Sequence, residues 1–303
     1  MKWEILRKGY HAWLLMERGL SKASIKAYIS DIQTFVDYSS LNNMPSPERA
    51  DSVHLARFIA QLGADELSIA TQARMVSALR SFYNYLLLEN IVTENPALLL
   101  EIPSRGRHLP DVLSVEEVYQ IIHIIDLSTT HGERDKAIIE TLYGCGLRVS
   151  ELTSLRISNL HFKEEFIKIV GKGNKERLVP LGSSAAAQIK RYLYNVRNRQ
   201  KIAPECEDIL FLNQRGKALS RVSIFTMVKR YSELCGIRKN VSPHSFRHSF
   251  ATHLIEGGAS LRAVQQMLGH VSITTTEIYT HVSNRYLRDA IMQFHPMEKK
   301  KPL

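Results

Sequence analysis

The sequence predicts a mainly α-helical fold with a small β-sheet, divided into a helical N-terminal domain and a mixed α/β C-terminal domain. The length of 303 residues allows two domains of ordinary size, and 44% hydrophobic residues are enough for real cores. Apolar residues recur at helical spacing through the first hundred residues, and alternating strand patterns occur only later. Residues 1–105 carry eleven basic and eleven acidic side chains, so the remainder carries the whole net charge of +10.

The first domain, residues 1–95, is expected to be a bundle of four short helices. Asparagines and prolines interrupt the helical pattern between Asn42 and Pro47. Three runs of apolar residues predict helices, and the first run has the spacing of one apolar face: Ile25, Tyr28, Ile29, Ile32, Phe35 and Val36; Val53, Leu55, Phe58, Ile59 and Leu62; and Met75, Leu79, Phe82, Tyr83 and Leu86.

Residues 96–110 are expected to be a linker. Asn95-Pro96 ends the helical pattern, and two prolines and a glycine follow between residues 102 and 110. The basic residues of this segment could lie along phosphates, and a plain flexible hinge is the equal alternative. Ser114 and Glu117 have the spacing of a capping box, which predicts that a new helix begins there.

The second domain, residues 111–282, is expected to combine helices with a hairpin. Residues 166–170 and 177–181 alternate as strands, and residues 171–176 join them as a turn. Helices are expected in several segments: residues 137–143, and from Ser184, near Ser223, from Phe246 and from Leu261.

Several protein classes are disfavoured. Three cysteines lie far apart without a Cys-x-x-Cys pair, so neither a disulfide framework nor a cysteine zinc site is expected. Glu4, Arg7 and Lys8 interrupt any apolar run near the N-terminus, which argues against a signal peptide. No segment has about eighteen uninterrupted apolar residues, so we expect a cytoplasmic protein without a membrane span. The basic second domain favours a polyanion such as DNA, RNA or an anionic membrane, although a merely soluble basic protein fits equally.

The second domain also contains residues suited to attack on a phosphodiester. A guanidinium fork pairs with two phosphate oxygens and keeps its proton, so arginines suit a phosphate clamp. A lysine between two glycines can approach DNA and protonate a leaving oxygen, or simply contact a phosphate. A phenol attacks poorly at neutral pH unless cations stabilise its phenolate. Such residues follow one another along the chain: Arg148, Lys172, His244, Arg247, His270 and Tyr279.

Two details leave alternatives open. Glu151 could hold Arg148 or a nearby histidine in place, or could be a carboxylate on a helix surface. The spacing of His244, His248 and His253 occurs in zinc sites, but a helix starting at His244 would put His253 on another face. No cysteine or convincing carboxylate completes a metal set, so no metal is expected. No P-loop motif predicts nucleotide hydrolysis.

The order of these residues and their local sequences resemble the tyrosine recombinases of the phage integrase family, most closely the XerD-like branch of the Xer group. The resemblance runs over essentially the whole chain. It implies an N-terminal SAM-like, four-helix core-binding domain and a mixed α/β catalytic domain, which close on duplex DNA as a C-shaped clamp. The lack of a long N-terminal extension fits the Xer group better than integrases with an added arm-binding domain. The segments that carry the resemblance are residues 146–152, 171–177, 244–248 and 268–270, followed by Tyr279.

The resemblance also implies roles for single residues. Tyr279 would be the nucleophile and would give a 3′-phosphotyrosyl intermediate, then a Holliday junction, without ATP, metal or another cofactor. His244 would handle protons or bind the phosphate, and His270 would hydrogen-bond the phosphate. Five basic residues are candidate DNA contacts, any of which could be a solvated surface charge: Lys22, Lys26, Arg74, Arg80 and Arg221.

The implied partners are double-stranded DNA and other protomers, in a homo- or hetero-tetramer on two DNA sites. A XerC-like recombinase commonly shares the site, and an FtsK-type translocase activates one of the pair to resolve chromosome dimers at a dif-like site. The same chemistry also serves mobile-element integrases and invertases. Outside the class, a catalytically silent DNA-binding protein and a metallohydrolase are the alternatives.

The tail, residues 283–303, carries Leu287, Ile291 and Phe294 at helical spacing. An apolar stripe at a terminus needs a surface that covers it. The tail helix could fold back on its own domain. The resemblance favours a second state, in which this helix is exchanged between protomers on DNA.

Overall fold

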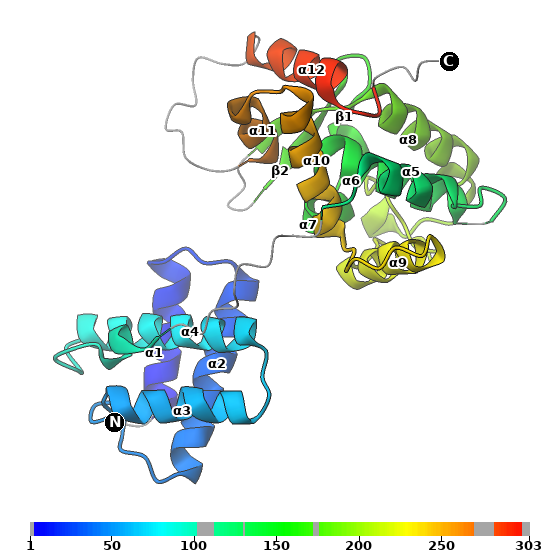
Figure 1. Cartoon of the computed structure of the whole chain (residues 1–303). Coiled ribbons are helices and arrows are strands. Elements are labelled where there is room, and N and C mark those ends of the chain that lie inside the picture. Colours follow the sequence, from blue (N-terminus) through cyan, green and yellow to red (C-terminus); the bar gives the residue numbers. More distant parts are fainter. Residues whose placement is uncertain (1–2, 102–111, 130, 172–175, 270–281, 299–303) are drawn as a thin grey trace. The chain divides into compact units, whose positions relative to one another are not determined.

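The chain forms two compact units, Met1–His108 and Leu109–Leu303 (Figure 1). The computed structural model describes residues 3–101, 112–129, 131–171, 176–269 and 282–298. Each unit has its own apolar core. None of the helices within the described residues is long and apolar enough to cross a membrane.

The first unit is the expected bundle of four helices. Three helices begin at side-chain caps, because Ser21, Asp51 and Ser68 each accept a hydrogen bond from the backbone N–H three residues later. The four helices are α1 (Trp3–Met16), α2 (Lys22–Leu41), α3 (Ser52–Ala64) and α4 (Ile69–Leu88).

Aromatic rings fill the core of this unit, and α4 packs against the other three helices. The ring centroids of Phe35 and Phe58 lie 5.1 Å apart, and those of Phe82 and Tyr10 lie 5.2 Å apart in the same core. Val53, one of the apolar residues that predict the third helix, is 56% exposed. It lies in the first turn of α3, and the buried face of that helix begins at Leu55.

The packed part of the first unit extends beyond residue 95. A 3₁₀ helix, η1 (Pro96–Leu99), follows α4, and Ala97 and Leu100 are buried in the core. Arg80 donates hydrogen bonds to the carbonyls of Ala97 (3.2 Å) and Leu100 (2.6 Å) and so holds this segment against α4. The rest of the expected linker, residues 102–110, lies outside the described residues.

The second unit contains the expected helices. Ser114 and Glu117 form the predicted capping box: the Ser114 N–H donates to Glu117 Oε2 (2.7 Å), and the Glu117 N–H donates to Ser114 Oγ (3.2 Å). The helices are α5 (Val115–His123), α6 (Gly132–Cys145), α7 (Val149–Thr153), α8 (Ser183–Asn195), α9 (Arg221–Leu234), α10 (Pro243–Gly257), α11 (Leu261–Leu268) and α12 (Val282–Phe294), with short 3₁₀ turns η2 (Ile157–Asn159), η4 (Arg197–Arg199) and η5 (Pro204–Cys206).

A small antiparallel sheet, in the order β1–β2–β3, completes this unit. Its strands are β1 (Leu160–His161), β2 (Phe166–Val170) and β3 (Glu176–Pro180). Ile167 pairs with Val179, and both side chains are buried, as the alternating pattern predicted. The second strand of the hairpin begins one residue earlier than expected.

Helix α6 is the central element of the second unit, with α8 and α10 packed against it (Figure 1). The tail helix α12 packs against α10, α11 and β3 of its own unit. Leu287 and Ile291 of α12 are buried in the core that these elements share. In this structure the apolar stripe of the tail is therefore covered within the same chain.

Candidate active site

A glycine turn between α6 and α7 positions Arg148. Gly146 ends α6 with φ +58°, in the left-handed region that favours glycine. A Cβ at this position would lie 2.4 Å from the Phe250 ring, so packing also requires glycine. The chain then turns through Leu147, and Arg148 is the residue just before α7, with its backbone extended.

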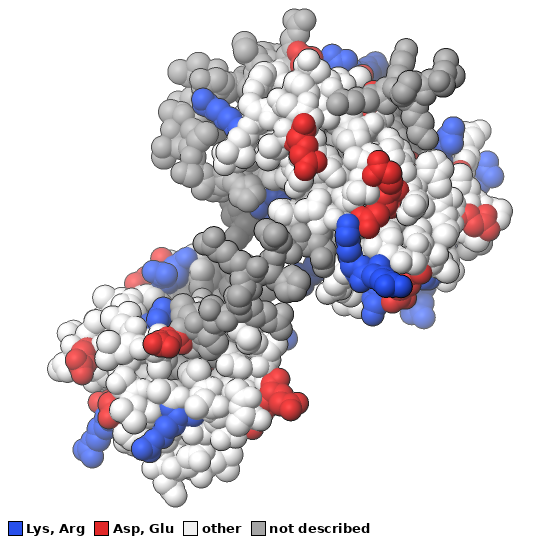
Figure 2. All heavy atoms as spheres, in the orientation of Figure 1, with Lys and Arg blue, Asp and Glu red and all other residues white. Residues whose placement is uncertain are grey.

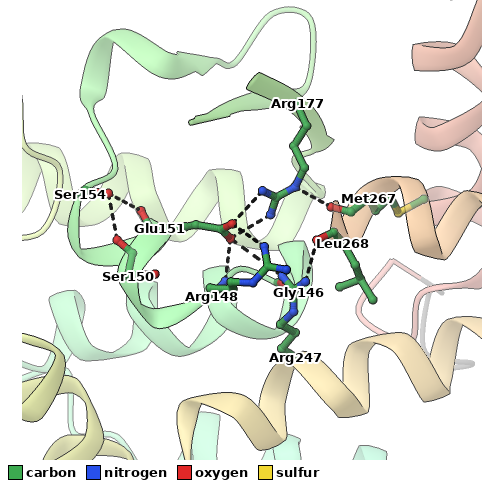
Figure 3. Close-up of polar contacts among 9 residues, drawn as sticks. All are labelled: Gly146, Arg148, Ser150, Glu151, Ser154, Arg177, Arg247, Met267 and Leu268. Atoms are coloured by element: carbon green, nitrogen blue, oxygen red, sulfur yellow. Dashed lines mark hydrogen bonds and ion pairs between the residues drawn. The ribbon is translucent and has the colours of Figure 1, made fainter. Parts of the chain in front are cut away.

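Glu151 is the centre of the site (Figure 3). Its carboxylate accepts hydrogen bonds from the Arg148 backbone N–H (2.8 Å) and from Arg148 Nη1 (2.9 Å). The Arg177 guanidinium pairs with both oxygens, because Nη1 donates to Oε1 and Nη2 to Oε2, each at 2.8 Å. The carboxylate is buried. Of the two roles considered for Glu151, the structure shows the one that holds Arg148, and excludes a surface carboxylate.

Arg247 enters the same site from α10. Its Nη1 donates to the Gly146 carbonyl (2.7 Å), and its Nη2 donates to the Leu268 carbonyl (2.6 Å). Nη1 also lies 3.9 Å from Glu151 Oε2. Burial and the nearby Arg148 charge lower the pKa of Arg247 to about 10, so the guanidinium is still charged at neutral pH. Arg148 and Arg247, separated by almost a hundred residues, thus meet at one carboxylate.

The electrostatics of this cluster suit an anion. Burial alone would raise the pKa of Glu151, but hydrogen bonds from Arg177 and Arg148 lower it to about 2, so the carboxylate is charged. Three guanidinium groups therefore surround a single negative charge. The excess positive charge, with a partly exposed Arg148, can stabilise a phosphate and the additional charge of its transition state.

His244 lies at the start of α10, as expected. Pro243 is the first residue of the helix, and the Ser242 N–H donates to Ser245 Oγ (3.1 Å) as part of the cap. Partial burial, Arg247 and His248 lower the pKa of His244 below its ordinary value. The imidazole is therefore neutral at neutral pH and can accept a proton.

His253 belongs to the core of the unit. It is buried, and its Nδ1 lies 2.8 Å from the Tyr143 hydroxyl. Within the part of the chain that the structure describes, no group of three or more His, Cys, Asp or Glu residues could hold a metal ion.

Three of the six expected residues, Lys172, His270 and Tyr279, lie outside the described residues. They lie in two gaps, residues 172–175 and 270–281, and the element that follows the first gap meets the element that precedes the second. Arg177 is the second residue of β3, which follows the hairpin turn, and its Nε donates to the Met267 carbonyl at the end of α11 (2.9 Å). The described chain next to Lys172 and that next to His270 are thus joined directly.

The candidate DNA contacts differ in their environment. Lys22 and Lys26 are exposed one turn apart at the start of α2, and Arg221 is exposed at the start of α9. Arg74 pairs with the buried carboxylate of Asp31 at 3.1 Å and keeps 42% of its side chain exposed. Arg80 is bound to backbone carbonyls of its own unit, so it is the least available of the five.

On the face seen in Figure 2, basic and acidic side chains are interspersed over the first unit. This distribution agrees with the balanced charge of residues 1–105. Any DNA contact by the first unit would therefore depend on individual residues such as Lys22 and Lys26, and not on a strong net charge.

Arg177 is a residue of this site that sequence reasoning missed. It was read only as part of an alternating strand and of a basic hairpin. Its side chain is 13% exposed, and both of its partners are distant in sequence, Glu151 by 26 residues and Met267 by 90. An arginine in a strand whose neighbours pack into the core was the available signal, because a buried arginine needs a buried partner.

Both units resemble known protein families. Residues 111–285 match the Phage integrase family, and residues 8–90 match the phage integrase N-terminal SAM-like domain. The chain is 41% identical over 288 residues to the tyrosine recombinase XerD of Listeria monocytogenes serotype 4b (strain F2365), an alignment that covers 94% of this chain and 96% of the relative. The identity to the tyrosine recombinase XerD of Staphylococcus haemolyticus (strain JCSC1435) is 39% over 293 residues, covering 97% and 99%.

A solved structure is similar over most of the chain. It is the XerH site-specific recombinase bound to a palindromic difH substrate, in a post-cleavage complex. The TM-score is 0.71 and the sequence identity is 28%, and the match covers 91% of this chain and 81% of the XerH chain.

Proposed function

The chain belongs to the phage integrase family of tyrosine recombinases, and from this premise we propose that it cuts and rejoins DNA at a specific site through Tyr279. The observation that carries the proposal is the cluster in which Arg148 and Arg247 meet around Glu151. The resemblance to the family assigns phosphate binding to these two arginines. Their combined charge exceeds what the single carboxylate neutralises, which supports an anionic ligand between them.

The proposed chemistry is a transfer of one phosphoester bond. Arg148 and Arg247 bind the nonbridging oxygens of the scissile phosphate and stabilise the charge that develops in the transition state. Tyr279 Oη attacks phosphorus and gives its proton to the neutral His244. The bond from phosphorus to the 5′ oxygen breaks, and Lys172 donates a proton to that oxygen. The 3′-phosphotyrosyl link keeps the ester, so the reverse reaction can rejoin DNA without ATP or metal.

The second part of the proposal concerns assembly. The free 5′-hydroxyl of a partner duplex attacks the phosphotyrosine to form a Holliday junction, and a second pair of exchanges completes recombination. This requires four protomers on two duplexes, as a homo-tetramer or with a XerC-like partner. The XerH structure, a relative bound to a difH site, supports double-stranded DNA as the partner.

The third part concerns biological role. We propose that the DNA target is a dif-like site and that the reaction resolves chromosome dimers, with an FtsK-type translocase as a possible activator. The support is the identity of about two residues in five to proteins named XerD over nearly the whole chain. A mobile-element integrase would have the same chemistry with a different target.

Recovery of covalently bound DNA tests the role. Protein is purified from its own cells under denaturing conditions, and the attached DNA is sequenced. We expect reads that end within one chromosomal site made of two inverted half-sites. Reads that end at the borders of a mobile element would contradict the proposed role in dimer resolution and would indicate an integrase.

A further inference from the structure

The Glu151 carboxylate lies between two guanidinium groups that differ in exposure. Arg148 binds it from the open side of the site, with 44% of its side chain exposed, and Arg177 binds it from the inner side, with 13% exposed. Arg177 donates one hydrogen bond to each carboxylate oxygen of Glu151. This bidentate pairing fixes the plane of the carboxylate, and hence the direction in which it offers its remaining lone pairs to Arg148.

The same guanidinium also fixes the end of α11. Arg177 Nε donates to the Met267 carbonyl (2.9 Å), and Arg247 Nη2 donates to the next carbonyl, that of Leu268 (2.6 Å). The last carbonyls of a helix have no hydrogen-bond donor within the helix, and here the two arginines supply the donors. Gly269, with φ +67°, follows closely, and a Cβ there would lie 3.0 Å from Arg177 Cδ.

From these contacts we propose that Arg177 is a positioning residue for DNA cleavage, which acts through Glu151 to hold Arg148 in the orientation that binds the scissile phosphate. This inference rests on the proposed recombinase function. The proposal gives Arg177 no contact with the phosphate, since its three described hydrogen bonds are to Glu151 and to the backbone of α11.

The consequence of losing Arg177 follows from the nearest charges. Glu151 would keep Arg148 as a partner, and the next cation is Arg247 Nη1, 3.9 Å from Oε2. A buried carboxylate without its main partner attracts the remaining cations or takes up a proton. Either response alters the phosphate clamp: the first pulls Arg247 from the Gly146 carbonyl, and the second removes the acceptor that orients Arg148.

Arginine is the residue that this position requires. One guanidinium serves two carboxylate oxygens and a carbonyl in three fixed directions, whereas a lysine ammonium is a point charge on a flexible stem. Arg177→Lys therefore keeps the charge beside Glu151 and loses the planar fork. Arg177→Met keeps most of the packing volume and loses both the charge and the planar fork.

The test measures single-turnover formation of the covalent adduct on a nicked duplex, over a range of pH, with duplex affinity measured in parallel. For Arg177→Met we expect a rate lower by on the order of 100-fold at neutral pH, as for misplaced catalytic groups in general. Duplex affinity should stay within about twofold, because one phosphate contact is a small part of DNA binding. The acid limb of the rate profile should move to higher pH, because Glu151 loses the partner that lowers its pKa. The rate of adduct formation by Arg177→Lys should lie between that of the unaltered protein and that of Arg177→Met.

Arg134→Met is the matched control. Arg134 is also 13% exposed and pairs with a buried carboxylate, that of Asp135, which keeps Tyr231 and Arg230 as partners. This change should lower thermal stability as much as Arg177→Met while leaving the acid limb in place. If Arg134→Met shifts the limb equally, the effect of Arg177→Met is general destabilisation and the inference fails.

A double substitution tests whether Arg177 acts through Glu151. Glu151→Gln keeps the shape of the side chain and removes its charge. If Arg177 acts through Glu151, adding Arg177→Met to this variant should lower the rate of adduct formation by less than about threefold further, since the effects of coupled sites are not additive. Losses that multiply independently would overturn the inference. Absence of any adduct with the unaltered protein would instead overturn the proposed recombinase function.

Discussion

At the scale of single residues, the proposed mechanism gives Arg148 and Arg247 different parts in binding a phosphate. Arg247 is buried and is fixed by two carbonyls, whereas Arg148 is partly exposed and is fixed by one carboxylate. Each guanidinium has five N–H donors, so both keep donors for a ligand. The buried arginine gives rigidity and the exposed one gives access.

Lys172 is expected to do something different from the arginines, namely to protonate the departing 5′ oxygen. A 5′-phosphorothiolate leaves readily without a proton, because a thiolate is a far weaker base than an alkoxide. This substrate should therefore restore cleavage by Lys172→Ala at least about tenfold more than cleavage by Arg148→Ala, which still lacks transition-state stabilisation. Cleavage rates on the two substrates measure the rescue. Equal rescue of both variants, or of neither, would contradict this division of roles.

Local patterns and long-range contacts differ in how well the sequence predicts them. The Ser114–Glu117 capping box and the place of His244 in the first turn of α10 depend on residues a few positions apart, and both were predicted correctly. The helix itself was expected from Phe246 and begins earlier, at Pro243. The pairing of Arg177 with Glu151 depends on two elements that meet only after folding. The sequence supplied Glu151 as a candidate partner of Arg148, but it contained no periodic signal that would assign Arg177 to it.

At the scale of elements, the tail is held by more than its helix. Beyond α12, His295 is buried, with its ring centroid 4.7 Å from that of Tyr143. Glu298 then accepts a hydrogen bond from Ser183 Oγ (2.7 Å) at the start of α8. The segment after α12 thus anchors the tail within its own unit, which the apolar stripe alone did not predict.

Burial of His295 makes the stability of the second unit depend on pH. Burial lowers the pKa of His295 from 6.5 to about 3, so the unfolded chain takes up a proton near pH 6.5 and the folded chain does not. The contribution of the neutral His295 to the free energy of unfolding is fully present above pH 6.5. It is lost as the pH falls from 6.5 toward 3. Linkage gives a loss of about 2 kcal/mol between pH 7 and pH 5.

Urea unfolding at the two pH values measures this loss. His295→Phe should reduce it, because the substituted ring has no proton to take up, and His253, whose pKa burial also lowers, should account for the remainder. An unchanged pH dependence in His295→Phe would show that His295 is not the titrating group.

Exchange of the tail between protomers remains a prediction, and the anchor offers a way to test it. Ser183→Cys with Glu298→Cys places two thiols on positions whose side chains are now joined by the hydrogen bond from Ser183 Oγ to Glu298 Oε2. A short thiol cross-linker should lock the tail in its own unit. Single-site binding should then persist, while cooperative binding to paired sites should fall by at least about tenfold, because multivalent binding depends on contacts between protomers.

Gel-shift titration with one and with two sites measures the change, and the same protein without cross-linker is the control. Cys145 and Cys206 are buried and Cys235 is half-buried, so the introduced pair should react first. If the locked protein binds paired sites as cooperatively as the control, the tail is not the coupling element.

At the scale of the whole molecule, the sequence predicted the division into a helical unit and a mixed unit, and the structure has both. Three helices of the first unit followed from helical spacing, and the hairpin of the second followed from strand alternation on either side of a turn. The predicted end of the first unit did not include Ala97 and Leu100, because a short 3₁₀ helix has too few residues to show a period. The expected C-shaped clamp concerns the two units together and stays a prediction.

The central claim is that Tyr279 forms a covalent bond with DNA, and a nicked duplex carrying the recovered target site tests it most directly. The unaltered protein should accumulate a covalent protein–DNA adduct in the presence of EDTA, because no metal takes part in the proposed reaction. Tyr279→Phe removes one oxygen, so it should bind the same duplex within about twofold and form no adduct, since the nucleophile is lost. An adduct formed by Tyr279→Phe at the unaltered rate would contradict the claim and would require a different nucleophile.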